Sequence, residues 1–231
     1  MVHTILVPGL LCSPRLYEPV LPAVWGFGAV TIADTRRDDS IAGIAARLLA
    51  GAPERFALVG LSMGGYVALE VMRQAPSRVA ALALMSTSAR SDSPEQTAAR
   101  REQLGRVEAG RFDEVVDAAF PKMVAESRVD DEALLATSRA MAAEVGPDVY
   151  VRQQEAVIAR ADSRPLLASI ACPTTVVHGR EDQLIAFKNG EELAAGIPGA
   201  VFAPIEGCGH TATLERPAEC AAALGALLAR A

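Results

Sequence analysis

Short apolar runs alternate with amphipathic stretches over much of the chain. Runs of this length, bounded by Gly, Pro or polar residues, predict buried strands rather than helices. Six strands are expected, at Thr4–Val7, Ala29–Ala33, Phe56–Val59, Val79–Met85, Thr174–Val177 and Ala200–Ala203. Apolar residues at helical spacing predict helices at Leu16–Leu21, Ile41–Ala50, Tyr66–Ala75 and Ala218–Ala229. This alternation predicts an α/β fold with a mostly parallel sheet and helices on both faces.

The alternation stops between residues 89 and 170, where no strand-like run occurs. Ser93-Pro94-Glu95-Gln96 has the pattern of a capping box and predicts a helix that reaches about Ala109. We therefore expect a helical cap, residues 89–170, inserted after the fourth visible strand into a core of residues 1–88 and 171–231. Further cap helices are expected at Phe112–Ala125, Asp131–Val145 and Pro147–Arg160. The large apolar side chains of the cap could line a pocket or pack the cap onto the core. They are Phe112, Phe120, Met123, Met141 and Tyr150.

The sequence Gly60-Leu61-Ser62-Met63-Gly64 connects a predicted strand directly to a predicted helix. Such a turn crowds the backbone, so the residues two before and two after its apex must lack side chains. Ser62 is then expected on a strained turn with its hydroxyl exposed, and the N–H of Met63 faces whatever the serine attacks. A bare G-x-S-x-G pattern is common by chance, but the strand and helix around it favour a nucleophilic serine.

A serine hydroxyl needs a base to take its proton at neutral pH. Of the three histidines, His3 precedes the first strand, at the wrong end of the sheet, and His178 is expected to pack beneath the turn after the fifth strand. His210 lies in a glycine-rich loop just past the sixth strand. That loop begins at the carboxyl edge, where an imidazole can reach Ser62, so His210 is the predicted base.

The base needs a carboxylate that fixes its tautomer and stabilises the imidazolium. Asp182 follows the fifth strand at the same sheet edge and is the predicted partner. Its neighbour Glu181 is the alternative, although adjacent side chains in a turn point apart. Asp34, after the second strand, and Asp92, after the fourth, are weaker candidates.

Composition and charge narrow the possible functions. The chain of 231 residues has a net charge of −6 and no basic cluster, which disfavours nucleic acid as a partner. Its four cysteines lack metal-ligand spacing, so we expect free thiols, with no metal and no cofactor. The opening residues lack the features of a signal peptide, and no apolar stretch reaches about 18 residues. We therefore expect a cytoplasmic protein without a membrane span.

With these features in place, the sequence resembles the α/β-hydrolase superfamily over essentially its whole length, and is similar to its cap-bearing small-molecule esterases. The likeness is strongest at Val59–Gly65, Thr174–Asp182 and Gly207–Pro217. The order Ser62, Asp182, His210 also matches that fold. Two features depart from the family: Pro8-Gly9 replaces its His-Gly, and the leading antiparallel hairpin of many members is missing. The resemblance implies that the N–H of Leu10, together with that of Met63, forms the oxyanion hole.

The leading hypothesis is a serine hydrolase that cleaves small to medium carboxylic esters through an acyl-enzyme on Ser62. A thioesterase acting on an acyl carrier would use the same triad, and Arg100, Arg101 and Arg106 could give it a basic patch at the cap mouth. A hydrolase of carbon–carbon bonds would also share the triad. A ligand receptor with slow turnover is the alternative from a different class.

Overall fold

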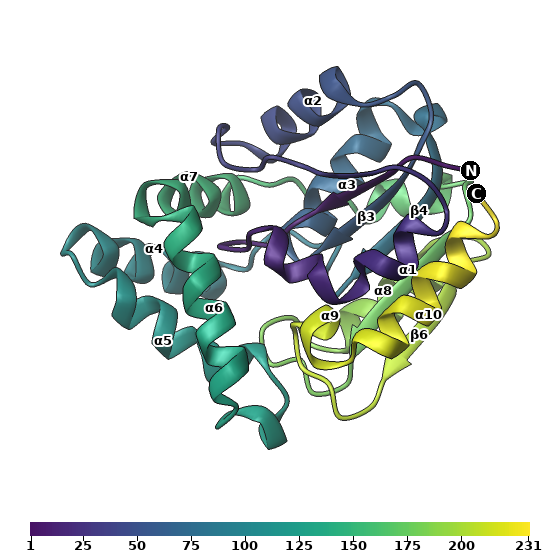
Figure 1. Cartoon of the computed structure of the whole chain (residues 1–231). Helices are drawn as coiled ribbons and strands as arrows, with labels where there is room; N and C mark the ends of the chain where they lie inside the picture. Colours follow the sequence, from purple (N-terminus) through teal and green to yellow (C-terminus); the bar gives the residue numbers. More distant parts are fainter.

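Six parallel strands form one sheet in the order β2-β1-β3-β4-β5-β6 in the computed structural model, which describes residues 1–231 (Figure 1). Every neighbouring pair is parallel, so the predicted α/β architecture is confirmed and no antiparallel hairpin precedes the sheet. The strands are β1 (Thr4–Val7), β2 (Val30–Ile32), β3 (Phe56–Leu61), β4 (Val79–Met85), β5 (Thr174–Gly179) and β6 (Val201–Ile205).

Helices cover both faces of the sheet because successive strand side chains point to opposite sides. Leu58 of β3 packs in one core with α2 (Ile41–Gly51), α3 (Met63–Gln74) and α8 (Lys188–Gly196). The next residue, Val59, packs in a second core with α1 (Leu21–Trp25) and α10 (Pro217–Leu228). The remaining short helices are α9 (Ala212–Glu215) and the 3₁₀ turns η1 (Pro14–Val20), η2 (Pro76–Arg78), η3 (Glu126–Arg128) and η4 (Arg164–Ser169). None of the helices has the length and apolar character needed to cross a membrane.

The helical insertion lies between β4 and β5, as predicted, and Figure 1 shows it grouped beside the sheet. It comprises α4 (Pro94–Glu108), α5 (Phe112–Met123), α6 (Glu132–Val145) and α7 (Pro147–Ile158). The capping box forms: Ser93 Oγ accepts from the Gln96 N–H, and Gln96 Oε1 accepts from the Ser93 N–H. The insertion packs on the loop after β1, where Leu10 and Leu11 contact Tyr150 and its apolar neighbours.

Three local predictions need correction. The helix expected at Leu16–Leu21 is a 3₁₀ turn followed by α1, in a stretch that contains three prolines. β3 runs on to Leu61 and α3 starts at Met63, because glycines around Ser62 hide the apolar pattern that marks both elements. The helices α8 and α9 were not predicted at all.

Candidate active site

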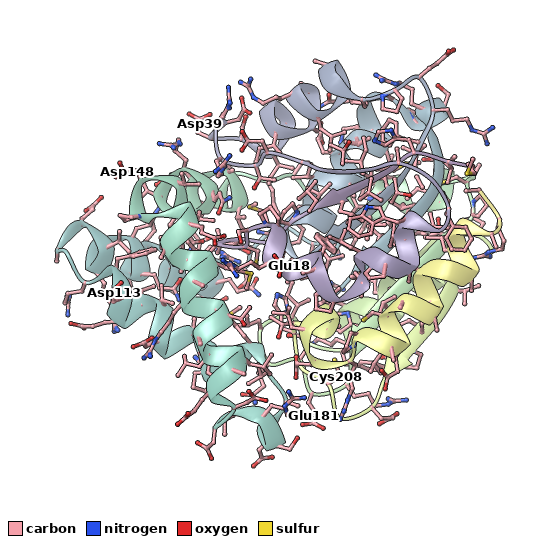
Figure 2. The ribbon with its side chains drawn as sticks, viewed as in Figure 1. Glu18, Asp39, Asp113, Asp148, Glu181 and Cys208 are labelled. Carbon is pink, nitrogen blue, oxygen red and sulfur yellow. The ribbon has the colours of Figure 1, made fainter.

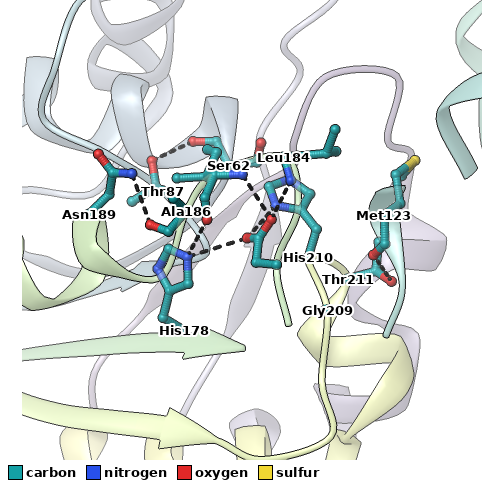
Figure 3. Close-up of polar contacts among 12 residues, drawn as sticks. Ser62, Thr87, Met123, His178, Leu184, Ala186, Asn189, Gly209, His210 and Thr211 are labelled. Carbon is teal, nitrogen blue, oxygen red and sulfur yellow. Dashed lines mark hydrogen bonds and ion pairs between the residues drawn. The ribbon is translucent and has the colours of Figure 1, made fainter. Parts of the chain in front are cut away.

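Ser62 is the single residue between β3 and α3, and its backbone has φ 57° and ψ −117°. Side chains rarely adopt positive φ, so this is a strained turn. The flanking glycines are required by space: a Cβ on Gly60 would lie 2.2 Å from the Gly64 carbonyl oxygen, and one on Gly64 would lie 1.9 Å from that of Val7. The Thr87 hydroxyl donates to the Ser62 carbonyl at 2.8 Å and helps to hold the turn (Figure 3).

His210 and Asp182 meet at the same edge of the sheet, from the loops after β6 and β5. His210 Nδ1 lies 2.7 Å from Asp182 Oδ2. The two side chains are buried, with relative exposures of 5% and 0%. The His210 loop is anchored to the cap, since the N–H groups of His210 and Thr211 both donate to the Met123 carbonyl. The sequence-based pairing of His210 with Asp182 is therefore present as a direct contact.

The Asp182 carboxylate is held in its ionised form. Burial alone would raise its pKa, but the positive charge of His210 and hydrogen bonds from His178 and His210 bring the pKa well below its usual value. The backbone adds to this, because Leu184 and Ile185 N–H donate to Oδ1 at 2.9 and 2.8 Å. A permanent negative charge beside His210 is what an imidazolium intermediate requires.

The other candidate carboxylates are engaged elsewhere. Glu181, labelled in Figure 2, accepts from the N–H of Glu126 at the base of the cap, at 3.1 Å. Asp34 binds the two arginines that follow it. Asp92 forms ion pairs with Arg100 and Arg160.

The other two histidines take structural positions. His178 is fully buried beneath the turn after β5, as expected, with Nε2 2.8 Å from the Ile185 carbonyl oxygen and 3.3 Å from Asp182 Oδ2. His3 contacts the Thr31 hydroxyl at 2.8 Å, at the amino end of the sheet. His210 is thus the one histidine that lines the cavity in front of Ser62.

Ser62 and His210 line one cavity of about 250 Å³ between the sheet edge and the cap. No hydrogen bond joins the Ser62 and His210 side chains. Catalytic hydrogen bonds are often long before substrate binds. Ser62 and His210 therefore face the same cavity without a direct hydrogen bond between their side chains.

Two backbone N–H groups beside Ser62 have no hydrogen-bond acceptor in the protein. Met63 is the first residue of α3, so its N–H has no carbonyl within the helix to pair with. Leu10, in the loop after β1, donates no hydrogen bond from its N–H. Both residues line the cavity beside Ser62. This arrangement can supply two donors to a developing oxyanion.

The cavity is mostly apolar, with 17 hydrophobic residues among the 25 that line it. Of the large cap residues considered above, Met123, Met141 and Tyr150 line it. Phe112 instead packs edge-on against Tyr150, and Phe120 packs with two other cap residues. Such a surface selects mainly by shape and apolar contact.

Sequence reasoning missed two buried side chains that hold the loops of the site. Glu215 Oε2 accepts from the N–H groups of Ala125 and Gly209, and its Oε1 accepts from Thr211. This carboxylate ties the His210 loop to the end of α5. Its only sequence signal was its place in the Gly207–Pro217 segment, which resembles a known family.

Gln153 of α7 is the second missed residue, and it is fully buried. Its Oε1 accepts from the Leu11 N–H at 3.0 Å, and its Nε2 donates to the Thr35 hydroxyl at 3.1 Å. Leu11 itself has φ 57°. The cap thereby fixes the strained loop that carries the free Leu10 N–H.

The side chains do not assemble a metal-binding group: no three His, Cys, Asp or Glu residues lie close enough to hold an ion. All four cysteines are free thiols, as expected. The catalytic potential of the site therefore lies in Ser62, the Asp182–His210 pair and the two N–H groups.

Comparison with known proteins places these features in a family. Residues 4–223 match the sequence profile of the alpha/beta hydrolase family. The chain is 28% identical over 231 residues to a pimeloyl-[acyl-carrier protein] methyl ester esterase of Aromatoleum aromaticum, covering 95% of this chain and 90% of that protein. A second protein of that name, from Chromobacterium violaceum, is 28% identical over 211 residues, covering 87% of this chain and 73% of its own length.

Solved structures share the whole fold. A thermophilic esterase from Thermogutta terrifontis superposes with a TM-score of 0.89 at 25% identity, covering 100% of this chain and 90% of its own. The enol-lactonase of Burkholderia xenovorans LB400 gives a TM-score of 0.90 at 24% identity, covering 99% of this chain and 91% of its own. At 24% identity, the similarity to the enol-lactonase is a similarity of fold.

Proposed function

Because the chain belongs to the alpha/beta hydrolase family, we propose that it hydrolyses carboxylic esters through an acyl-enzyme on Ser62. The observation that carries the proposal is the buried Asp182–His210 contact of 2.7 Å. His210 of this pair lines the same cavity as the strained Ser62. The names of the relatives, several of which are esterases, support an ester as the substrate. The reaction needs water and no cofactor.

In the first half-reaction, Ser62 Oγ attacks the ester carbonyl carbon while His210 takes the hydroxyl proton. The N–H groups of Leu10 and Met63 receive the oxyanion, and Asp182 balances the imidazolium charge. The carbon–oxygen bond to the alcohol then breaks, and His210 gives the proton to the leaving oxygen. In the second half-reaction, water attacks the acyl-enzyme, His210 takes a proton from the water and returns it to Ser62, and the free acid leaves.

A small or medium ester fits this site better than a polymer. The cavity of about 250 Å³ lies just below the usual range for ligand pockets, about 300–1,000 Å³. Its apolar wall discriminates poorly between acyl chains that differ by one methylene, at about 1–3 kcal/mol each. We therefore expect activity on several short esters rather than on one.

The basic patch expected for a thioesterase has no support in the contacts of its three arginines. Arg101 pairs with Glu155, and Arg106 pairs with Glu102 on its own helix, while Arg100 faces the cavity. These three residues do not form a free basic patch at the cap mouth. An ester of a small molecule is therefore the favoured substrate. No feature of the site specifically supports hydrolysis of a carbon–carbon bond.

Hydrolysis of p-nitrophenyl esters from acetate to octanoate tests the proposal. We expect turnover with the shorter chains, and loss of about 10⁴–10⁶ in kcat in Ser62→Ala with an unchanged melting temperature. Ser88→Ala, a buried serine outside the cavity lining, is the matched control and should retain wild-type kcat. Retention of more than about a thousandth of the activity in Ser62→Ala would remove Ser62 as the nucleophile.

A further inference from the structure

One wall of the cavity is polar, and it lies on the cap. Arg100, Gln96 and Gln103 of α4 line the cavity there, together with Tyr150 of α7. Arg100 is the only arginine or lysine among the 25 lining residues, and its side chain is 23% exposed. An apolar pocket with one cationic wall selects a ligand with an apolar body and one polar end.

The charge around Arg100 is not balanced. Its Nε donates to Asp92 Oδ2 at 2.7 Å, but the same carboxylate also pairs with Arg160, whose Nη1 lies 2.7 Å from Oδ1 without hydrogen-bond alignment. The Asp92 and Arg160 side chains are only 2% and 6% exposed. Two guanidinium groups therefore share one buried carboxylate, which leaves one positive charge. The nearby Glu155 does not offset it, because Glu155 pairs with Arg101.

The polar wall also has more free hydrogen-bond donors than free acceptors. Gln154 Oε1 accepts from Arg100 Nη1, and Gln103 Oε1 accepts from the Tyr150 hydroxyl and from Gln154 Nε2. Gln96 Oε1 is occupied by the Ser93 N–H. The side-chain oxygens of these glutamines are thus in use.

Three donors remain without a protein partner: Arg100 Nη2, Gln103 Nε2 and Gln96 Nε2. An ionised carboxylate only accepts hydrogen bonds, so it complements a wall that only donates. Its single negative charge also matches the one excess positive charge.

We propose that Arg100, with Gln96 and Gln103, binds a carboxylate at the far end of the substrate, so that the preferred substrates are half-esters of dicarboxylic acids. The choice of half-esters rests on the proposed ester hydrolysis at Ser62; the carboxylate site itself does not. The apolar lining between the two ends would hold the connecting methylene chain. Hydrolysis of such a half-ester consumes one water and releases the alcohol and the dicarboxylate.

The test compares monomethyl adipate with methyl hexanoate, which have the same acyl chain and differ only in the terminal carboxylate. Monomethyl esters from succinate to pimelate locate the best length. We expect kcat/KM to favour the carboxylate ester by about 10–100-fold at the best length, the range for hydrogen bonds to charged groups. Arg100→Met should abolish this preference, so that the ratio of kcat/KM for the two esters falls to about one.

Arg101→Met is the matched control, because the neighbouring Arg101 pairs with Glu155 on the surface. It should leave both substrates unchanged. Arg100→Met keeps Asp92 paired with Arg160, so its melting temperature should stay near that of wild type. The absence of any preference for the carboxylate esters, or an equal effect of Arg101→Met, would overturn the proposal.

A binding measurement separates this proposal from the ester hydrolysis. Titration calorimetry of adipate and hexanoate with Ser62→Ala uses no turnover. We expect adipate to bind at least about 10-fold more tightly, and Ser62→Ala/Arg100→Met to lose the difference. Adipate binding that survives Arg100→Met would exclude the arginine site, whereas inactivity towards every ester with intact adipate binding would reject only the proposed hydrolysis.

Discussion

At the level of single residues, Ser62 combines an unfavourable backbone with strong local support. A non-glycine residue at positive φ costs about 1–3 kcal/mol. The turn is held by the Ser62 N–H, which donates to the Met85 carbonyl at 2.9 Å, and by the Thr87 hydroxyl on the Ser62 carbonyl. The strain exposes the serine side chain at the end of a buried strand, where the free Met63 N–H is also available.

Asp182→Asn tests the role of the buried carboxylate. The variant keeps the shape of the side chain but removes its charge and disturbs the tautomer of His210. We expect kcat to fall by about 10⁴ in ester hydrolysis assays. Glu181→Gln is the control, since Glu181 contacts the cap and not His210, and its kcat should match wild type. An Asp182→Asn enzyme with more than about a tenth of wild-type kcat would contradict the assignment.

The same carboxylate also sets a pH dependence of stability. Its pKa is lower in the folded than in the unfolded chain, so the unfolded chain binds more protons as the pH falls. The stabilisation is complete above about pH 4 and is lost as the pH falls further. Urea unfolding from pH 6 to pH 2 should show a steeper loss of unfolding free energy for wild type than for Asp182→Asn. Parallel curves would contradict a depressed pKa.

The placement of Ser62, Asp182 and His210 at one edge of the sheet could be predicted from sequence, whereas the residues that support them could not. Ser62, Asp182 and His210 each follow a predicted strand, and the carboxyl ends of parallel strands meet at one edge. Gln153 has no such local signal, because its partner Leu11 is 142 positions away. Glu215 likewise reaches across 90 positions to Ala125. Only the fold brings these hydrogen-bonding groups together.

Among the elements, the β3–α3 turn depends on the absence of side chains at two glycines. Gly60→Ala places a Cβ 2.2 Å from a backbone oxygen that cannot move freely. We expect a loss of several kcal/mol in unfolding free energy, of the order seen for overpacked cores, together with loss of activity. Gly105→Ala is the control: it lies in α4 with open space around it and should stabilise by about 0.5–1 kcal/mol. Equal stability of the two variants in urea unfolding would refute the steric argument.

The helix α7 couples the cap to the loop after β1 through Gln153. Gln153→Met keeps the volume but leaves the Leu11 N–H without its acceptor, at a cost of about 1–3 kcal/mol. We expect lower stability and a lower kcat, since the Leu10 N–H loses its fixed position. Arg152→Met, which removes only contacts to the Arg36 carbonyl, should change neither. Normal kcat in Gln153→Met would show that the loop holds its geometry without the cap.

Strongly periodic elements were predictable and weakly marked ones were not. The Val79–Met85 strand has the predicted bounds because its seven residues form a continuous apolar run, buried on both sheet faces. In contrast, α8 (Lys188–Gly196) has only two fully buried residues, so its apolar signal is weak. The helix α9 has four residues and is too short to show a period.

For the whole molecule, we propose that residues 89–170 form a cap that can open independently of the core. The two sheet cores contain 25 and 21 buried apolar residues, only six of which belong to residues 89–170, whereas the two clusters within the cap contain three each. Segments with few buried contacts open more readily. Hydrogen exchange should therefore be faster in α4–α6 than in β3 and β4. Equal protection of cap and core would contradict an opening cap.

The cap carries a net negative charge rather than a basic surface. Residues 89–170 carry 15 acidic and 11 basic side chains, and Asp113 and Asp148 lie exposed on it (Figure 2). The basic residues of α4 are paired or turned into the cavity. Cap sequence alone suggested a basic patch, because it does not reveal which arginines meet acidic partners on neighbouring helices.

The most direct test of an activated serine is labelling with a fluorophosphonate, followed by intact mass and peptide mapping. The nucleophilic serine is predicted to give a single adduct, on Ser62, and none in Ser62→Ala. Labelling should also be lost in Asp182→Asn on the same time scale, because the Asp182–His210 pair activates the hydroxyl. No adduct under conditions that label a control esterase, or an adduct on another residue, would contradict catalysis by Ser62.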